Sequence, residues 1–195
     1  MRIVGGKWRG RSVAAPEGRQ TTRPTTDRAR ESIASMILSA AGLDLSGASV
    51  LDAFAGSGAM GLELVSRGAA RATFVDRDRT AARRVRASAQ ALGALPEEFF
   101  SLAGDVFALA ARGLAGAPFD VVFLDPPYAV GATRASELVR ALARTGQLAD
   151  GALVVYEHSA GSDGLAGPGL SGLRSKTHGI TTVDLLVSHA DGWKQ

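Results

Sequence analysis

The chain has 195 residues, of which 46% are apolar and 21% are charged, a balance typical of one globular domain with a substantial core. It contains no cysteine, which excludes disulfides, thiolate metal sites and a cysteine nucleophile. The net charge is only +3, and no apolar run is long enough to cross a bilayer.

Residues 1–42 are expected to form an N-terminal extension. Short β-like pieces around Gly5 and Gly10 predict a small hairpin. After a polar connector, Thr26 or Asp27 is suited to cap a helix that runs to about Ala41. Residues 43–195 are then expected to form a separate main domain.

In that main domain, β-like and helix-like segments alternate. Strands are predicted at 49–55, 72–76, 99–105, 119–125 and 152–158. A helix that follows a glycine loop and ends at about 67, and helices at 79–92, 106–114 and 132–144, are predicted between them. Because these strands are apolar throughout, we expect an α/β fold with a doubly wound, mostly parallel sheet covered on both faces. Residues 173–190 add two β-like segments around Gly179, which predict an antiparallel pair at one edge.

The first strand is followed by Gly56-Ser57-Gly58-Ala59-Met60-Gly61, a literal match to the G-x-G-x-x-G fingerprint of dinucleotide sites. Acidic residues stand at the ends of four successive strands: Asp52, Asp76, Asp105 and Asp125. Ligands of doubly wound sheets bind at the carboxyl ends of the strands. The sequence therefore predicts one ligand crevice with a partly anionic lining.

Asp52 argues against NAD in this crevice. A pyrophosphate on the following helix would be repelled by the Asp52 carboxylate, whereas the ammonium and sulfonium of S-adenosylmethionine would be attracted. Gly56 and Gly58 would let the backbone approach this cofactor, and Asp76 would bind its ribose hydroxyls. Asp105 would accept from the adenine amino group, with Val106 beside the ring. We expect Gly61 to serve helix–strand packing instead.

The fourth strand is followed by Asp125-Pro126-Pro127-Tyr128. Two prolines stiffen such a loop. It can present the Asp125 carboxylate and the Pro126 carbonyl to the two hydrogens of an exocyclic amine, while Tyr128 stacks on the base. The amine lone pair would then face a methyl donor, so that catalysis is mainly alignment and charge placement.

These motifs resemble a known family. LDAFAGSG followed by DPPY is similar to the class I methyltransferases that act on amino groups of nucleic acids, with Phe54 and Ala55 inside the cofactor loop. RIVGGKWRGR, RPTTDRARESI and FAGSGAMGLE narrow the resemblance to the bacterial RsmD family, over about residues 1–190. It implies methylation of a guanine N2 in small-subunit (16S) ribosomal RNA, by a class I, Rossmann-like methyltransferase.

The same resemblance assigns roles in the N-terminal extension. It implies that Arg23, Thr25 and Thr26 lie near the methionine end of the cofactor, and that Lys7, Arg9 and Arg11 face RNA. The charge agrees, because residues 1–31 hold eight Lys or Arg against three Asp or Glu. On charge alone, a merely solubilising arm is an equal alternative.

Other functions remain open at this point. A DNA N6-adenine or other nucleic-acid amino-group methyltransferase shares the Asp-Pro-Pro-Tyr loop. An NAD oxidoreductase is disfavoured by Asp52, and an inactive nucleic-acid-binding module by the intact loop. The three histidines lack metal-ligand spacing, so no metal is expected. We expect a cytoplasmic monomer whose partner is ribosomal RNA or the small ribosomal subunit, with no membrane association.

Overall fold

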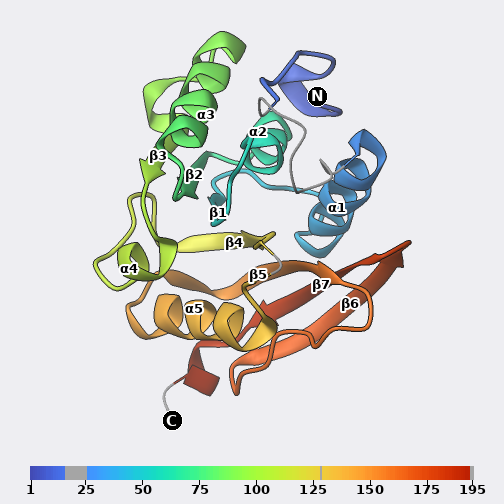
Figure 1. Cartoon of the computed structure of the whole chain (residues 1–195), viewed down its shortest axis with the longest axis vertical. Coiled ribbons are helices and arrows are strands. Elements are labelled where there is room, and N and C mark those ends of the chain that lie inside the picture. The colour runs from blue at the N-terminus through green and yellow to red at the C-terminus, as the bar shows by residue number, and fades with distance from the viewer. Residues whose placement is uncertain (16–25, 128, 194–195) are drawn as a thin grey trace.

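The protein is described by a computed structural model over residues 1–15, 26–127 and 129–193. Its centre is a seven-stranded sheet in the order β3-β2-β1-β4-β5-β7-β6 (Figure 1). Neighbouring strands from β3 to β5 are parallel, and β7 pairs antiparallel with both β5 and β6. The strands are β1 (Ser49–Asp52), β2 (Arg71–Asp76), β3 (Phe99–Ala103), β4 (Phe119–Leu124), β5 (Leu148–Ser159), β6 (Leu170–His178) and β7 (Thr181–Ser188).

Helices cover both faces of the sheet, which gives two hydrophobic cores. The helices are α1 (Asp27–Ala40), α2 (Ala59–Ser66), α3 (Arg79–Leu92), α4 (Val106–Ala110) and α5 (Ala132–Arg144). Ile37 of α1, Leu64 of α2 and Val85 of α3 belong to one core. Ala110 of α4 and Leu138 of α5 belong to the other. The predicted α/β doubly wound sheet with an antiparallel edge pair is confirmed.

Local sequence signals set most helix ends. The Thr26 hydroxyl accepts from the backbone N–H of Ala29 over 3.2 Å, which confirms the predicted cap of α1. Asp78 caps α3 in the same way, and Gly93 ends it in the left-handed conformation. Several expected bounds differ: β1 ends at Asp52, β3 ends at Ala103, α4 stops at Ala110 and β5 starts at Leu148.

The N-terminal segment is less regular than the expected hairpin. It has one antiparallel bridge, Arg2 to Ser12, around a 3₁₀ turn at Gly6–Trp8. The buried Glu63 carboxylate of α2 holds this turn by accepting from the N–H groups of Val4 (2.7 Å) and Gly5 (2.8 Å). A boundary between residues 42 and 43 stays a prediction.

No helix within the three described stretches is both long and apolar enough to span a bilayer.

Candidate active site

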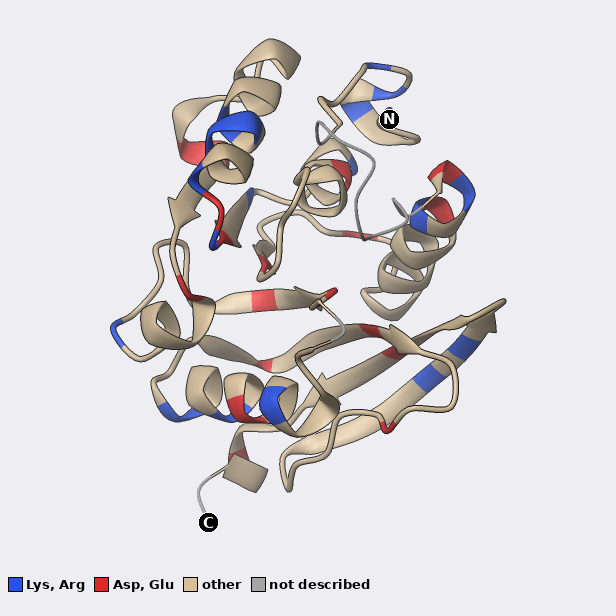
Figure 2. Cartoon of the chain, viewed as in Figure 1, with Lys and Arg blue, Asp and Glu red and all other residues tan. Residues whose placement is uncertain are grey.

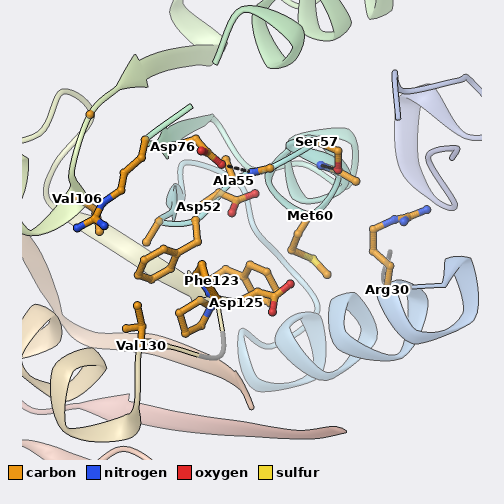
Figure 3. Close-up of a pocket in the computed structure, with 18 of the residues that line it drawn as sticks. Arg30, Asp52, Ala55, Ser57, Met60, Asp76, Val106, Phe123, Asp125 and Val130 are labelled. Carbon is orange, nitrogen blue, oxygen red and sulfur yellow. Dashed lines mark hydrogen bonds between the residues drawn. The ribbon is translucent and has the colours of Figure 1, made fainter. Parts of the chain in front are cut away.

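A cleft of about 310 Å³, the first cleft, opens at the carboxyl ends of β1, β2 and β4 (Figure 3). The sequence predicts a ligand crevice at this edge of the sheet, and Asp52, Asp76 and Asp125 line the cleft. Nine of the site residues expected from the sequence line it: Asp52, Phe54, Ala55, Gly56, Asp76, Val106, Asp125, Pro126 and Pro127.

The glycine loop bends sharply at the mouth of the first cleft. Gly56 has a φ of 54°, and a Cβ built there would meet nothing within 4 Å. The loop is tied to β2, because Asp76 Oδ2 accepts from the N–H of Gly56 over 2.8 Å. Asp76 Oδ1 accepts from the N–H of Asp78 over 2.8 Å. Since a carboxylate has about four acceptor positions, Asp76 keeps capacity for ligand hydroxyls.

Asp52 lies on the floor of the first cleft and is only 2% exposed. Its Oδ2 accepts from the N–H of Gly61, in the first turn of α2, over 3.1 Å. Burial, together with the nearby Asp125 and Asp76 carboxylates, raises the pKa of Asp52 to about 7 despite this hydrogen bond. The helix N-terminus that would bind a pyrophosphate therefore already faces a carboxylate.

Gly58 and Gly61 serve packing and do not line the first cleft. A Cβ at Gly61 would lie 2.3 Å from Phe74 Cε1 on β2, so α2 can approach the strand only because Gly61 has no side chain. A Cβ at Gly58 would lie 2.8 Å from Cγ2 of Val85. The packing role predicted for Gly61 is confirmed. Gly58, which was expected to approach the cofactor, packs against Val85 of α3 instead of lining the first cleft.

The loop after β4 separates the first cleft from a second cavity. Asp125 follows the last residue of β4, and the N–H of Val130 donates to the Pro127 carbonyl over 2.8 Å, which closes a turn. The Asp125 side chain is open to the cleft space, but the surrounding protein removes enough water to raise its pKa to about 6.

This second cavity has a volume of about 450 Å³. Asp125, Pro126 and Val130 line both spaces. Its other walls come from α1, the end of β5 and the turn between β6 and β7. A ligand in either space would thus meet the same short segment after β4.

Comparisons with known proteins bear on this arrangement. The family described as "Conserved hypothetical protein 95" matches residues 1–187. "Ribosomal RNA small subunit methyltransferase D" of Escherichia coli K12 is 38% identical over 157 residues, covering 80% of this chain and 74% of the relative. The chain belongs to the RsmD family of ribosomal RNA methyltransferases. The "Ribosomal RNA small subunit methyltransferase D" of Haemophilus influenzae is 29% identical, and the match covers 95% of this chain and 92% of that relative.

Solved structures agree with the RsmD assignment. The Escherichia coli protein yhhF superposes with a TM-score of 0.80 at 31% identity, covering 97% of this chain and 98% of its own. Both the resemblance and the class I methyltransferase fold expected from the sequence are therefore confirmed.

Several expected site residues of this RsmD-family chain lie outside the first cleft. Thr26 lines the second cavity. Asp105 caps α4 by accepting from the N–H of Phe107 (3.0 Å), and its other oxygen accepts from Arg77 (2.6 Å). Its neighbours Gly104 and Val106 line the cleft while Asp105 does not. Arg23, Thr25 and Tyr128 lie outside the described residues.

Two of the three expected RNA-facing residues have intramolecular partners. Lys7 forms an ion pair with Glu98 and lies 4.6 Å above the Trp8 ring. Arg11 donates to the carbonyl of Leu92 (3.1 Å) and to that of Ala91, at the C-terminus of α3. Arg9 is exposed, and no side-chain partner for it occurs among the described residues.

Sequence reasoning missed Arg30, which lines the first cleft on the side of α1 (Figure 3). It is 1% exposed, and its Nη2 donates to Asp27 over 2.8 Å and to the Arg2 carbonyl. Its Nε lies 3.7 Å from Oε2 of Glu63 and has no hydrogen-bond partner within residues 1–15, 26–127 and 129–193. A signal existed, because Arg30 shares the buried helical face of Ile33 and Ile37.

Proposed function

We propose that this protein transfers a methyl group from S-adenosylmethionine to the exocyclic N2 amine of a guanine in 16S ribosomal RNA. The observation that carries the proposal is that Asp125, Pro126 and Val130 line both the first cleft and the second cavity. A donor on one side and an amine on the other would meet at this wall. Membership of the RsmD family supports ribosomal RNA as the substrate.

The first cleft has the chemistry for a cationic, adenosine-bearing cofactor. Asp52 supplies negative charge beneath the glycine loop, and its contact with Gly61 disfavours a pyrophosphate there. Asp76 offers free acceptor positions for a ribose. Phe54 and Phe107 meet edge to face with ring centroids 6.3 Å apart, and both line the cleft where an adenine would need apolar contact.

Positioning would dominate the reaction. When bound, S-adenosylmethionine supplies a methyl group on a positively charged sulfur. Asp125 and the Pro126 carbonyl would accept the two N2 hydrogens and turn the nitrogen lone pair toward that methyl group. Asp125 or water would take the amine proton that is released when the methyl group moves from sulfur to nitrogen. With a pKa near 6, Asp125 is mostly ionised at neutral pH and thus able to accept.

The experiment is nucleoside mass spectrometry of ribosomal RNA from cells that lack this protein. We expect N2-methylguanosine to disappear from one position and to return when the wild-type chain is supplied, but not when the Asp125→Ala chain is supplied. An unchanged N2-methylguanosine content, or the loss of a methylated adenine instead, would refute the proposed function.

A further inference from the structure

One carboxylate at the second cavity is unused by the function proposed above. Glu157 lines this cavity from the end of β5, where it pairs with Val183 of β7. Its Oε2 is buried and has no hydrogen-bond partner among the residues that the structure describes. A buried acceptor without a donor is costly, so its presence calls for a partner that arrives from outside the chain.

Within the described part of the chain, the charged and titratable neighbours of Glu157 give it no counterion. His158, next on β5, has Nε2 3.0 Å from Asp184 Oδ2 and Nδ1 2.9 Å from the Ser162 hydroxyl. His158 also stacks on Tyr156 with ring centroids 4.8 Å apart. Asp184 in turn accepts from Ser175 over 2.6 Å. These groups satisfy one another, which leaves Glu157 as the unpaired acceptor.

Besides His158 and Tyr156, two other titratable residues of the described chain line the cavity with Glu157. Asp125, across the cavity from the loop after β4, is negative, and His178 lines the cavity from the end of β6. Burial, and secondly the charge of Asp125, raise the pKa of Glu157 to about 8. A ligand that donates a proton-bearing nitrogen would favour the ionised form of Glu157.

We propose that Glu157 selects guanine by accepting a hydrogen bond from the N1–H of the target base. In guanine, N1–H and the N2 amine are adjacent donors, so Glu157 and Asp125 can bind the same edge. Adenine and cytosine present an acceptor nitrogen beside their amines, so neither base can donate a hydrogen bond to Glu157 there. This assignment rests on the proposed function and adds the residue that decides its base specificity.

The test compares two bases that share the reacting amine. A small ribosomal subunit is reconstituted with RNA that carries guanine or 2-aminopurine at the position mapped by mass spectrometry. 2-Aminopurine keeps the 2-amine but has no hydrogen on N1. In an assay above pH 8, where Glu157 is ionised, we expect the wild type to prefer guanine by about tenfold or more in kcat/KM, since 2-aminopurine loses one hydrogen bond to a charged group.

Glu157→Gln should reduce that preference to near unity, because a Gln amide can donate to the bare N1. The matched control is Glu137→Gln on α5, where an exposed Glu pairs with Arg134. Affinity for S-adenosylhomocysteine, which binds elsewhere, should stay within about twofold and reports that the variant folds. A wild type with no preference for guanine overturns the assignment without any variant, and so does a folded Glu157→Gln that keeps the preference. If the wild type methylates neither RNA, the proposed function itself has failed.

A second inference concerns the path of the RNA. Edge strand β6 is exposed from Ser171 to His178. Arg174, Lys176 and His178 alternate along it, which puts them on one face of the sheet. Figure 2 shows the basic positions of β6 as blue bands on the strand.

That face leads to the second cavity. In the antiparallel register of β6 and β7, Lys176 lies opposite Val183, and His178 lies opposite Thr181. Val183, His178 and Thr181 line the cavity. Lys176 also donates to Ser32 of α1 over 3.1 Å. We infer that β6 binds the phosphate backbone of the RNA segment whose base enters the second cavity, because positive side chains on an exposed strand match phosphate charge.

The salt dependence of RNA affinity tests this surface. Arg174→Gln/Lys176→Gln should weaken binding to 16S ribosomal RNA and lower the slope of log affinity against log salt by about one to two. The matched control, Arg140→Gln/Arg144→Gln, removes two exposed positive charges from α5. If both double variants give the same slope as the wild type, or if the control loses as much as the β6 variant, the β6 assignment is wrong.

Discussion

The Asp76 carboxylate, at the end of β2, accepts a 2.8 Å hydrogen bond from the backbone N–H of Gly56, in the loop after β1 (Figure 3). This contact explains why an acidic residue twenty positions after the glycines belongs to the same site. The hydrogen bond holds the glycine loop against the end of β2. The acceptor positions that Asp76 does not use for Gly56 and Asp78 are available to the ribose hydroxyls of a cofactor.

Asp76→Ala should therefore weaken S-adenosylmethionine binding by about 10- to 150-fold, since a hydrogen bond to a charged acceptor contributes about 1.5–3 kcal/mol. Calorimetry measures the affinity. Asp163→Ala, in the exposed loop after β5, is the control and should bind as the wild type does. An unaltered affinity for Asp76→Ala would mean that the ribose binds elsewhere.

Asp52 should make cofactor affinity depend on pH. Its pKa is raised to about 7 by burial, and a cationic ligand favours the ionised form, so binding releases a proton. Affinity should rise about tenfold between about pH 6 and pH 8 and level off above. Asp52→Asn, which can still accept from Gly61, should bind weakly and without this pH dependence. A wild-type affinity that is flat over this range would contradict the prediction.

The same raised pKa has the opposite effect on stability. The folded state favours protonated Asp52, so its contribution to the free energy of unfolding is lost as pH rises through about 7. Asp52→Asn should consequently raise the melting temperature of the ligand-free protein at about pH 8, by about 2–4 °C for each kcal/mol gained. Little or no change is expected at about pH 4, where both proteins are neutral at this position.

The sequence predicted the fold well because apolar strands, capped helices and glycines act locally. The N-cap of α1 and the C-cap of α3 depend on residues within a few positions of the helix ends. Asp52, Asp76 and Asp125 were also predictable, since each strand end delivers its residue to one edge of the sheet.

Long-range pairing was not predictable in the same way. Arg11 and Lys7 were expected to face RNA, yet they contact Leu92 and Glu98, more than eighty positions away. Asp105 was expected to end its strand, yet it lies two residues beyond β3, and Arg77 donates to one of its oxygens. No sequence pattern indicated a role for Glu157, because the cavity that it lines is formed by four segments that are far apart in the sequence.

Gly61 and Gly56 should respond differently to the same substitution. Gly61→Ala forces a Cβ to within 2.3 Å of Phe74, so it should destabilise the protein by about 1–3 kcal/mol. A Cβ at residue 56 has space, but Gly56→Ala needs a φ of 54°, which residues with a side chain rarely adopt. This substitution should therefore distort the glycine loop that would bind the cofactor. Thermal unfolding should report mainly Gly61→Ala, and cofactor titration mainly Gly56→Ala. Equal effects of both variants in both measurements would contradict the separate roles.

Asp125 should be required for methyl transfer and not for cofactor binding. Asp125→Ala should abolish turnover while affinity for S-adenosylmethionine stays within a few fold. In the wild type, kcat should fall as pH drops through about 6, because a protonated Asp125 no longer accepts from the amine at that site. Unchanged turnover in Asp125→Ala, measured as label transferred to ribosomal RNA, would remove the acceptor role.

Arg9 and Arg11 should separate into a binding residue and a structural one. Neutralising both together is expected to reduce RNA affinity and its salt dependence. Arg9→Gln alone should produce that loss, since its exposed side chain has no partner in the described part of the chain. Arg11→Gln should instead lower stability by about 1 kcal/mol, because Arg11 satisfies carbonyls at the C-terminus of α3. If Arg9→Gln leaves both the affinity and the salt slope unchanged, the N-terminal segment does not bind RNA, and β6 remains the basic surface to which the phosphates would bind.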